Sequence, residues 1–121
     1  MALVGTISGC SQTAVAPVGH CSPQYKVGAA EGGLTVQQAG KGKAITWGIY
    51  VAAKYKTGTT WHVTVRADGT KIDSKNQAYE PHGSVNAARA AKYSGKILEI
   101  SGSALHGKDD LLTFDGKCKI A

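Results

Sequence analysis

The sequence is poor in proline, in aromatic residues and in charge, and it has no long apolar run. With 3 prolines in 121 residues, 42% hydrophobic content and only 18% charged residues, it lacks the composition of a disordered chain. No apolar stretch approaches the roughly 20 residues that a membrane-spanning helix requires. We therefore expect a single domain over residues 1–121, with one core and no transmembrane segment.

Motifs of common catalytic and cofactor sites are also missing. The chain has no G-x-S-x-G, no C-x-x-C and no H-E-x-x-H, and the segment Gly40-Lys41-Gly42-Lys43 lacks the Ser or Thr that completes a phosphate-binding loop. The pair Asp109-Asp110 follows a glycine and a lysine, and we interpret it as solvated charge in a turn. The sequence therefore predicts no metal and no cofactor, and it favours a binding protein over an enzyme.

Cysteine is scarce as well, because only Cys10, Cys21 and Cys118 are present, which allows at most one disulfide within the chain. A bond between Cys10 and Cys21 would close an irregular loop and stabilise the fold by about 3 kcal/mol in the chain-entropy model. We expect this bond, with Cys118 left as a small buried thiol between two lysines. A disulfide favours an extracellular location. A native start at Met1 would favour a virion or the cytoplasm instead.

What the sequence does contain is a strong alternation of apolar residues. It runs through Ile45–Tyr55 and resumes over Trp61–Val65, and a period of two residues is typical of β-strands with one buried face. A three-residue loop at Lys56-Thr57-Gly58, with its glycine in the left-handed region, would place Val51 opposite Val63 on one face. The sequence therefore predicts that these two strands form an antiparallel pair.

Two Asp-Gly dipeptides predict further hairpins, because this dipeptide is typical of type I′ turns. The first, Asp68-Gly69, would set Ile72 opposite Val65. The second, Asp115-Gly116, would join the short strands on either side of it into a C-terminal hairpin. Together with the pair above, the first turn predicts a three-stranded meander.

One short helix is expected at about residues 84–94. Ser84 is a suitable N-cap, several alanines follow it, and Gly95 is a suitable stop. A polar connection over residues 73–83, which contains Pro81, should precede the helix without regular structure. The fold class that these patterns predict is mainly β: an antiparallel meander forming a compact sandwich or partly closed barrel, with one short helix.

The polar face of the predicted meander gathers aromatic, hydroxyl and basic side chains. Sugars and nucleobases both stack on aromatic rings while polar neighbours bind their hydroxyl groups. We therefore predict that this face binds a ligand through Tyr50, His62, Thr64, Arg66 and Lys71, with Tyr50 across from Thr64.

The formal net charge of +6 is compatible with an anionic partner such as nucleic acid, a phospholipid surface or an acidic glycan. The lysines are scattered along the chain and form no long basic block, which weakens the case for nucleic acid. The principal hypothesis is therefore a small, basic, extracellular binding or effector domain that recognises a glycan or anionic ligand.

Two other functions stay open. Cleavage of RNA through a cyclic phosphate needs a base, an acid and a cation, and His62, Glu80, His82 and Arg66 can supply them in a small ribonuclease. Small β domains rich in Gly, Ala and Thr also assemble into virions, shells or filaments, which predicts a homo-oligomer. A helix packed over His62 and Arg66 would exclude both the ligand-binding and the ribonuclease hypotheses.

Overall fold

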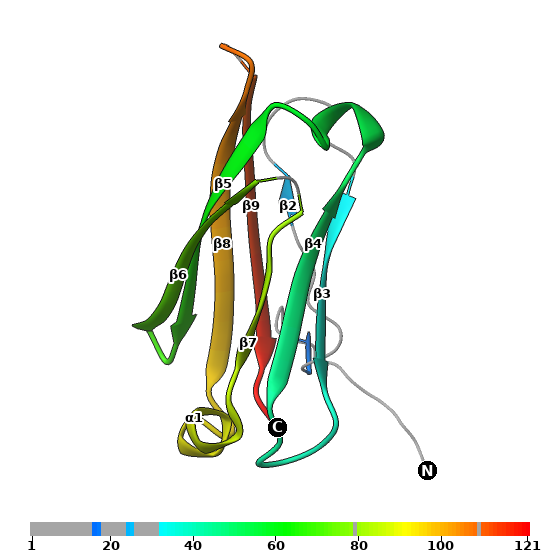
Figure 1. The fold of residues 1–121 in the computed structure, drawn as a ribbon. Helices are drawn as coiled ribbons and strands as arrows, with labels where there is room; N and C mark the ends of the chain where they lie inside the picture. Colours follow the sequence, from blue (N-terminus) through cyan, green and yellow to red (C-terminus); the bar gives the residue numbers. More distant parts are fainter. Residues whose placement is uncertain (1–15, 18–23, 26–31, 79, 109) are drawn as a thin grey trace.

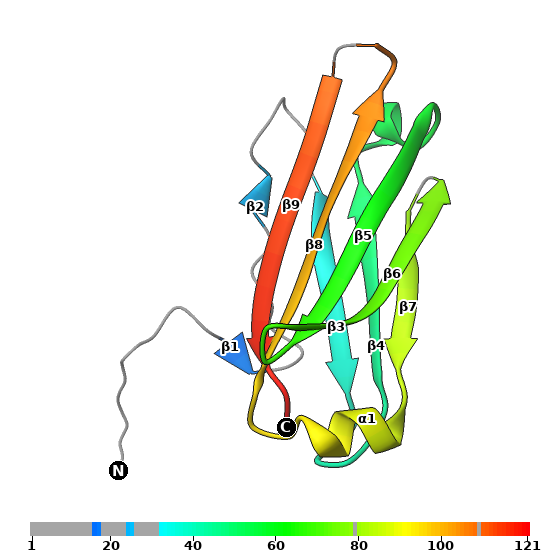
Figure 2. The ribbon, with the colours of Figure 1, turned by 90° about the vertical axis from the view of Figure 1, so that its left-hand side faces the viewer.

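The computed structural model in Figure 1 describes residues 16–17, 24–25, 32–78, 80–108 and 110–121. In this part of the chain two β-sheets lie face to face, with a short α-helix at one end of the sandwich (Figures 1 and 2). The mainly β fold and the sandwich are confirmed, and the two sheets do not join into a barrel. None of the described helices has the length and apolarity needed to cross a bilayer.

The larger sheet has the order β1-β9-β8-β5-β6, and β2 also pairs with β9. Its strands are β1 (Ala16–Pro17), β2 (Gln24–Tyr25), β5 (Thr59–Ala67), β6 (Thr70–Ala78), β8 (Ile97–His106) and β9 (Asp110–Lys119). The smaller sheet contains β3 (Gly32–Gln38), β4 (Ile45–Val51) and β7 (His82–Val85). Among the described strands every pairing is antiparallel except that of β1 with β9.

β6 and β7 extend into the segment 73–83, for which the sequence predicts no regular structure. This prediction is wrong because a polar sequence can still form a strand at the edge of a sheet. β6 ends the described order of the larger sheet, so only one of its edges pairs with another described strand. An edge strand tolerates polar and charged residues, which also discourage pairing with other chains.

The core lies between the two sheets, which bury alternate residues against each other. Burial alternates along β5, where Trp61 and Val63 are buried, and along β4, where Ile49 and Val51 are buried. The Trp61 ring contacts the ring of Phe114 on β9 edge to face, with centroids 5.4 Å apart. The alternation therefore predicted correctly which residues of these strands are buried.

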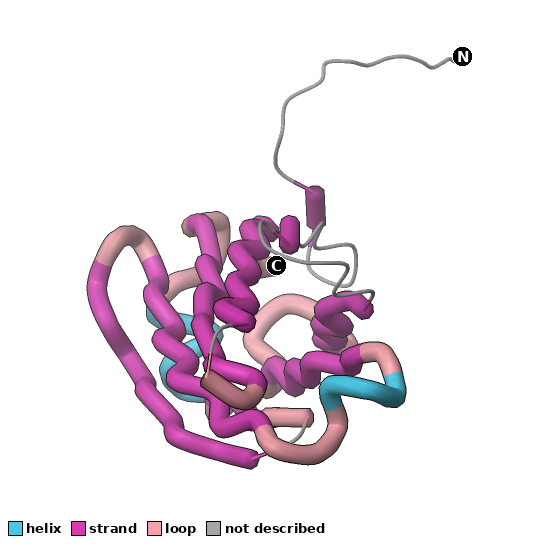
Figure 3. The backbone as a smooth tube through the Cα atoms, turned by 90° about the horizontal axis from the view of Figure 1, so that it is seen from above, coloured by secondary structure: helices cyan, strands magenta, loops and turns pink. Residues whose placement is uncertain are grey.

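The predicted pairing of these two strands is wrong. β4 pairs with β3 and β7, whereas β5 pairs with β6 and β8, so Val51 and Val63 belong to different sheets. The reason lies in the connection, which contains a 3-10 helix, η1 (Ala53–Tyr55), whose Tyr55 side chain is buried. The hydroxyl of Thr59 donates to the Tyr55 carbonyl at 2.8 Å. The anchored connection crosses the end of the sandwich from one sheet to the other (Figure 3).

The turn at Asp68-Gly69 is confirmed, but the register beyond it differs from the prediction. Both residues have a positive φ, of 52° and 78°, as a type I′ turn requires. A β-bulge between Val65 and Arg66 then shifts the pairing, so that Asp73 and not Ile72 lies opposite Val65. A bulge adds one residue to one strand, and this reverses which of the later residues face the core.

The second predicted hairpin is wrong. β9 runs without a turn through Asp115 and Gly116, which pair with Ser101 and Ile100 of β8. The chain reverses before β9, where Gly107 has a φ of 66°. The preference of Asp-Gly for a turn is local, and continuous pairing with β8 outweighs it.

The helix α1 (Ala87–Lys92) is shorter than predicted and begins later. Its N-cap is Asn86, whose side chain accepts a hydrogen bond from the Arg89 N–H at 2.8 Å, whereas Ser84 belongs to β7. Arg89 Nη1 donates to the Ile72 carbonyl of β6 at 2.6 Å and so ties the helix to the end of the sandwich. The outer face of the larger sheet is therefore not covered by α1 (Figure 2).

The predicted bond between Cys10 and Cys21 lies outside the described residues. Cys118 is buried between two exposed lysines, as the alternation predicted. Its sulfur is disulfide-bonded, so the expectation of a free thiol at this position is wrong. β1 pairs with β9 at Cys118, opposite Ala16, and brings an N-terminal segment beside this cysteine. Since three cysteines allow only one disulfide within the chain, a bond at Cys118 and the predicted bond between Cys10 and Cys21 cannot both form in one molecule.

Replacing Gly102 by alanine should destabilise the sandwich. A Cβ at Gly102 would lie 2.5 Å from Phe114 Cε1 and 3.0 Å from the His62 carbonyl oxygen, so a core ring would have to move. We expect Gly102→Ala to lower the free energy of unfolding in urea by about 1–3 kcal/mol. Gly40→Ala is the matched control, because nothing lies within 4 Å of a Cβ there. Equal stability of the two variants would contradict this packing.

The state of Cys118 can be measured by peptide mapping. Protein purified without reductant is alkylated, digested and analysed by mass spectrometry before any reduction. We expect Cys118 in a peptide that is cross-linked to another cysteine of the chain, because its sulfur is disulfide-bonded. Recovery of alkylated Cys118 from unreduced, denatured protein would contradict this assignment.

Candidate functional site

The structure divides the predicted ligand-binding residues between two sheets. His62, Thr64 and Arg66 lie on the outer face of β5, and Lys71 of β6 pairs with Arg66. Tyr50 lies on β4 of the smaller sheet, where it is 52% exposed. Its predicted position across from Thr64 is wrong, because β4 and β5 do not pair. Tyr50 therefore does not form the predicted aromatic platform on the face around His62.

The four residues of the ribonuclease hypothesis do not gather on one face either. Glu80 is held at the end of β4, where its Oε2 accepts a backbone N–H at 3.1 Å and its Oε1 lies 3.8 Å from Lys56 Nζ. His82 lies on β7 of the smaller sheet, whereas His62 and Arg66 lie on the larger one. The base, the acid and the cation would thus have to act from separate surfaces.

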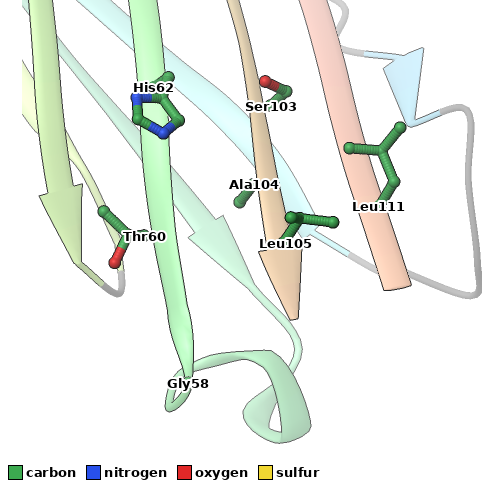
Figure 4. Close-up of a pocket in the computed structure, with 7 residues that line it drawn as sticks. All are labelled: Gly58, Thr60, His62, Ser103, Ala104, Leu105 and Leu111. Carbon is green, nitrogen blue, oxygen red and sulfur yellow. The ribbon is translucent and has the colours of Figure 1, made fainter. Parts of the chain in front are cut away.

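A hollow of about 370 Å³ opens on the outer face of the larger sheet (Figure 4). The residues that line it come from β5, from the loop before β5, from β8 and from β9: Gly58, Thr60, His62, Ser103, Ala104, Leu105 and Leu111. The pairing of the strands places them, since His62 is opposite Ser103 and Leu105 is opposite both Thr60 and Leu111. The relative positions of these side chains are therefore set by the hydrogen bonds of the sheet.

The hollow has a polar side and an apolar side. Thr60, His62 and Ser103 contribute two hydroxyl groups and an imidazole, whereas Leu105 and Leu111 are 54% and 42% exposed. Among the described residues that line the hollow, none carries a carboxylate, an ammonium or a guanidinium group. A few polar groups beside an apolar surface are typical of small-molecule sites.

Asn76 orients the ring of His62. The two residues pair across β5 and β6, and His62 Nδ1 lies 2.5 Å from Asn76 Oδ1. The carboxamide oxygen only accepts hydrogen bonds, so Nδ1 carries the hydrogen and Nε2 of the neutral ring is an acceptor. Nε2 makes no hydrogen bond to any described residue. The imidazole thus offers the hollow an acceptor with a defined orientation.

The β-bulge determines that Asn76 is the neighbour of His62. If the register set by the Asp68-Gly69 turn continued without a bulge, Lys75 would lie opposite His62. The shift at the bulge places Asn76 there instead. A lysine has hydrogen-bond donors and no acceptor, so it could not hold Nδ1 in its protonated form. Bulges commonly redirect side chains beside functional sites.

Sequence reasoning found His62 but missed the other residues of the hollow. Asn76 lies in a segment for which the sequence predicts no regular structure, and Ser103 becomes a neighbour of His62 only through the long-range pairing of β5 with β8. One signal was present, because Leu111 and Leu112 are consecutive and successive side chains of a strand point to opposite faces. One of the two leucines had to face outward.

A second, smaller hollow of about 220 Å³ lies on the smaller sheet and is lined by Thr35, Gln37, Thr46, Trp47 and Gly48. The Thr35 hydroxyl already donates to the Gly48 carbonyl at 3.2 Å, and Trp47 is only 3% exposed. Within the described ranges, no three His, Cys, Asp or Glu side chains gather to hold a metal ion. The hollow beside His62 is therefore the better candidate site.

The tautomer of His62 can be observed directly. At a pH where imidazoles are neutral, long-range ¹H–¹⁵N NMR spectra should show His62 with its hydrogen on Nδ1, because Asn76 Oδ1 accepts it. Asn76→Ala removes the acceptor and should shift the ring towards the Nε2–H form that free histidine prefers. His82 in the same spectra serves as an internal control. A mainly Nε2–H form of His62 in the unchanged protein would contradict the assignment.

Comparisons with known proteins give no relative for this chain. No protein-family model matches the sequence, and neither the curated proteins nor the solved structures contain a match. The chemistry of the hollow, with its polar and apolar sides, is therefore the basis for the proposed function.

Proposed function

We propose that this protein is a non-enzymatic binding domain and that the hollow on its larger sheet recognises a neutral ligand with hydroxyl groups, namely a glycan. The observation that supports this most is the composition of the hollow. The hydroxyl groups of Thr60 and Ser103 and the Nε2 atom of His62 lie beside the side chains of Leu105 and Leu111. A sugar presents hydroxyl groups next to apolar C–H surface, and so it matches both sides.

The distribution of charge favours a neutral ligand over an anionic one. Arg66 is four residues from His62, which corresponds to about 13 Å along a strand. It pairs with Lys71 on one side and with Glu99 on the other, and Glu99 Oε2 lies 3.8 Å from Lys117 Nζ. The surface around Arg66 therefore carries both signs of charge, whereas the described lining of the hollow has no carboxylate, ammonium or guanidinium group.

The scaffold suits recognition because the hollow is built on paired strands. β5 is flanked by β6 and β8, so His62 has neighbours on both sides that keep its backbone in place. A backbone held in this way needs little reordering on binding, which improves affinity. A glycan-binding role is compatible with the extracellular location that the sequence predicts, and we retain that location as part of the proposal.

A self-assembling subunit is the second candidate function. The exposed pair of Leu105 and Leu111 supports it, because cross-strand apolar side chains can also pack against another copy of the chain. The ribonuclease hypothesis lacks comparable support, because Glu80 and His82 lie away from His62.

A glycan array followed by titration of the protein with the bound glycans tests the proposal. We expect His62→Ala and Ser103→Ala each to weaken binding by roughly fivefold or more, because each removes a hydrogen-bonding partner. Arg66→Ala is the matched control from the same face of β5. It should bind as the unchanged protein does, and added salt should have little effect because none of the described lining residues is an acidic residue, a lysine or an arginine.

Two outcomes would contradict the proposal. If binding weakened steeply with added salt and Arg66→Ala reduced this salt dependence, the ligand would be an anion bound near Arg66. Absence of any glycan binding, together with a large oligomer of defined mass in sedimentation that Leu105→Ser dissociates, would favour the assembly function.

A further inference from the structure

We infer that the glycan recognised by the hollow carries a 6-deoxyhexose, whose methyl group contacts Leu105 and Leu111 while a ring hydroxyl donates to His62 Nε2. This inference rests on the proposed function and specifies the class of sugar. It follows from two features of the hollow, the leucine pair on one side and the oriented imidazole on the other.

The apolar side selects against a polar substituent. Leu105 lies on β8 opposite Leu111 of β9, and the two side chains are adjacent at the hollow (Figure 4). The hydroxymethyl group of an ordinary hexose placed here would lose water and gain no partner from the leucines. A buried polar group without a partner weakens binding by roughly 5- to 100-fold. A methyl group at the same place buries apolar surface without this loss.

The polar side accepts a hydroxyl hydrogen. Asn76 holds the hydrogen of His62 on Nδ1, so Nε2 can only accept while the ring is neutral. Ser103 is the cross-strand neighbour of His62, and such neighbours have Cβ atoms about 5 Å apart. The Ser103 hydroxyl can donate or accept, so the pair is suited to two neighbouring hydroxyl groups of one sugar ring. The ring hydroxyls and the methyl group are thereby directed to opposite sides of the hollow.

The hollow described on the smaller sheet is not a comparable site. It is lined by Thr35, Gln37, Thr46, Trp47 and Gly48, and the one large apolar residue among them, Trp47, is 3% exposed. The described lining of this hollow therefore has no accessible apolar surface that would favour a methyl group over a hydroxymethyl group.

Pairs of sugars that differ only in the C6 hydroxyl test the inference. Methyl α-L-fucoside is compared with methyl α-L-galactoside, and methyl α-L-rhamnoside with methyl α-L-mannoside, by NMR titration of the full chain labelled with ¹⁵N. We expect at least one deoxy sugar to bind roughly fivefold or more tightly than its hydroxylated partner. The largest shifts should occur at Thr60, His62, Ser103, Leu105 and Leu111.

A variant locates the preference in the hollow. Leu105→Ser places a hydroxyl group on the apolar side and should bring the two members of the pair to nearly equal affinity. Ile97→Ser is the matched control, since Ile97 lies on the same strand and, by strand alternation, on the same face, about 26 Å away. It should keep the preference of the unchanged protein. Thermal unfolding of both variants checks that they are folded.

The results separate this inference from the proposed function. Equal or tighter binding of the hydroxylated sugars at the hollow would overturn the inference and leave glycan binding in place. A preference that persists in Leu105→Ser would also overturn it, because the leucine side would not be its source. If none of the four sugars and no glycan on the array binds, both the inference and the proposed function fail.

Discussion

Burial of one face of each sheet against the other is the interaction on which the rest of the structure depends. Along β5, Trp61, Val63 and Val65 are at most 2% exposed, and each such side chain contributes roughly 1.5–3 kcal/mol when it leaves water. Because successive side chains of a strand point to opposite faces, burial of these residues turns His62 outward. A slip of one residue would bury the imidazole and expose the core. The candidate site is thus a consequence of the core.

The bulge after the Asp68-Gly69 turn connects this constraint to the chemistry of the hollow. It leaves the core face of β5 unchanged, but it moves β6 by one residue, and Asn76 becomes the neighbour of His62. The same shift places Lys75 opposite Val63 on the inward side of an edge strand. Inward-pointing charges of this kind discourage pairing between sheet edges. One local irregularity therefore affects both the orientation of the imidazole and the protection of the sheet edge.

The sequence allowed a correct prediction of what is local and repetitive. The alternation in β4 and β5 identified the buried residues, and the Asp68-Gly69 turn formed as its dipeptide predicts. Pairing partners could not be predicted in the same way, because an amphipathic strand fits equally well beside any strand that shares its buried face. The connection that contains the buried Tyr55 leads the chain from one sheet to the other. The burial of Tyr55 depends on packing in three dimensions, which the local sequence pattern does not specify. The hairpin predicted at Asp115-Gly116 does not form for a related reason, because the long pairing of β9 with β8 outweighs a local turn preference.

In the candidate site, too, local patterns could be predicted from the sequence and long-range pairings could not. His62 could be found because the alternation of side chains along the strand is enough to place it on the polar face. Leu105, Ser103 and Asn76 could not, since they reach the site through pairings across the sheet that no short motif specifies. The predicted role of Tyr50 failed because it assumed that β4 and β5 are neighbours. Our proposal of a glycan and not an anion depends on the lack of acidic residues, lysines and arginines among the described lining residues, and the lining follows from strand pairing that the sequence does not specify.

A crystal structure of the protein with a bound glycan tests the central claim most directly, because it locates the ligand without reference to any variant. We expect a sugar in the hollow on the larger sheet, with a hydroxyl oxygen within hydrogen-bond distance of His62 Nε2 and apolar atoms against Leu105 and Leu111. A sugar bound instead on the smaller sheet beside Tyr50, with the hollow empty at saturating ligand, would contradict it.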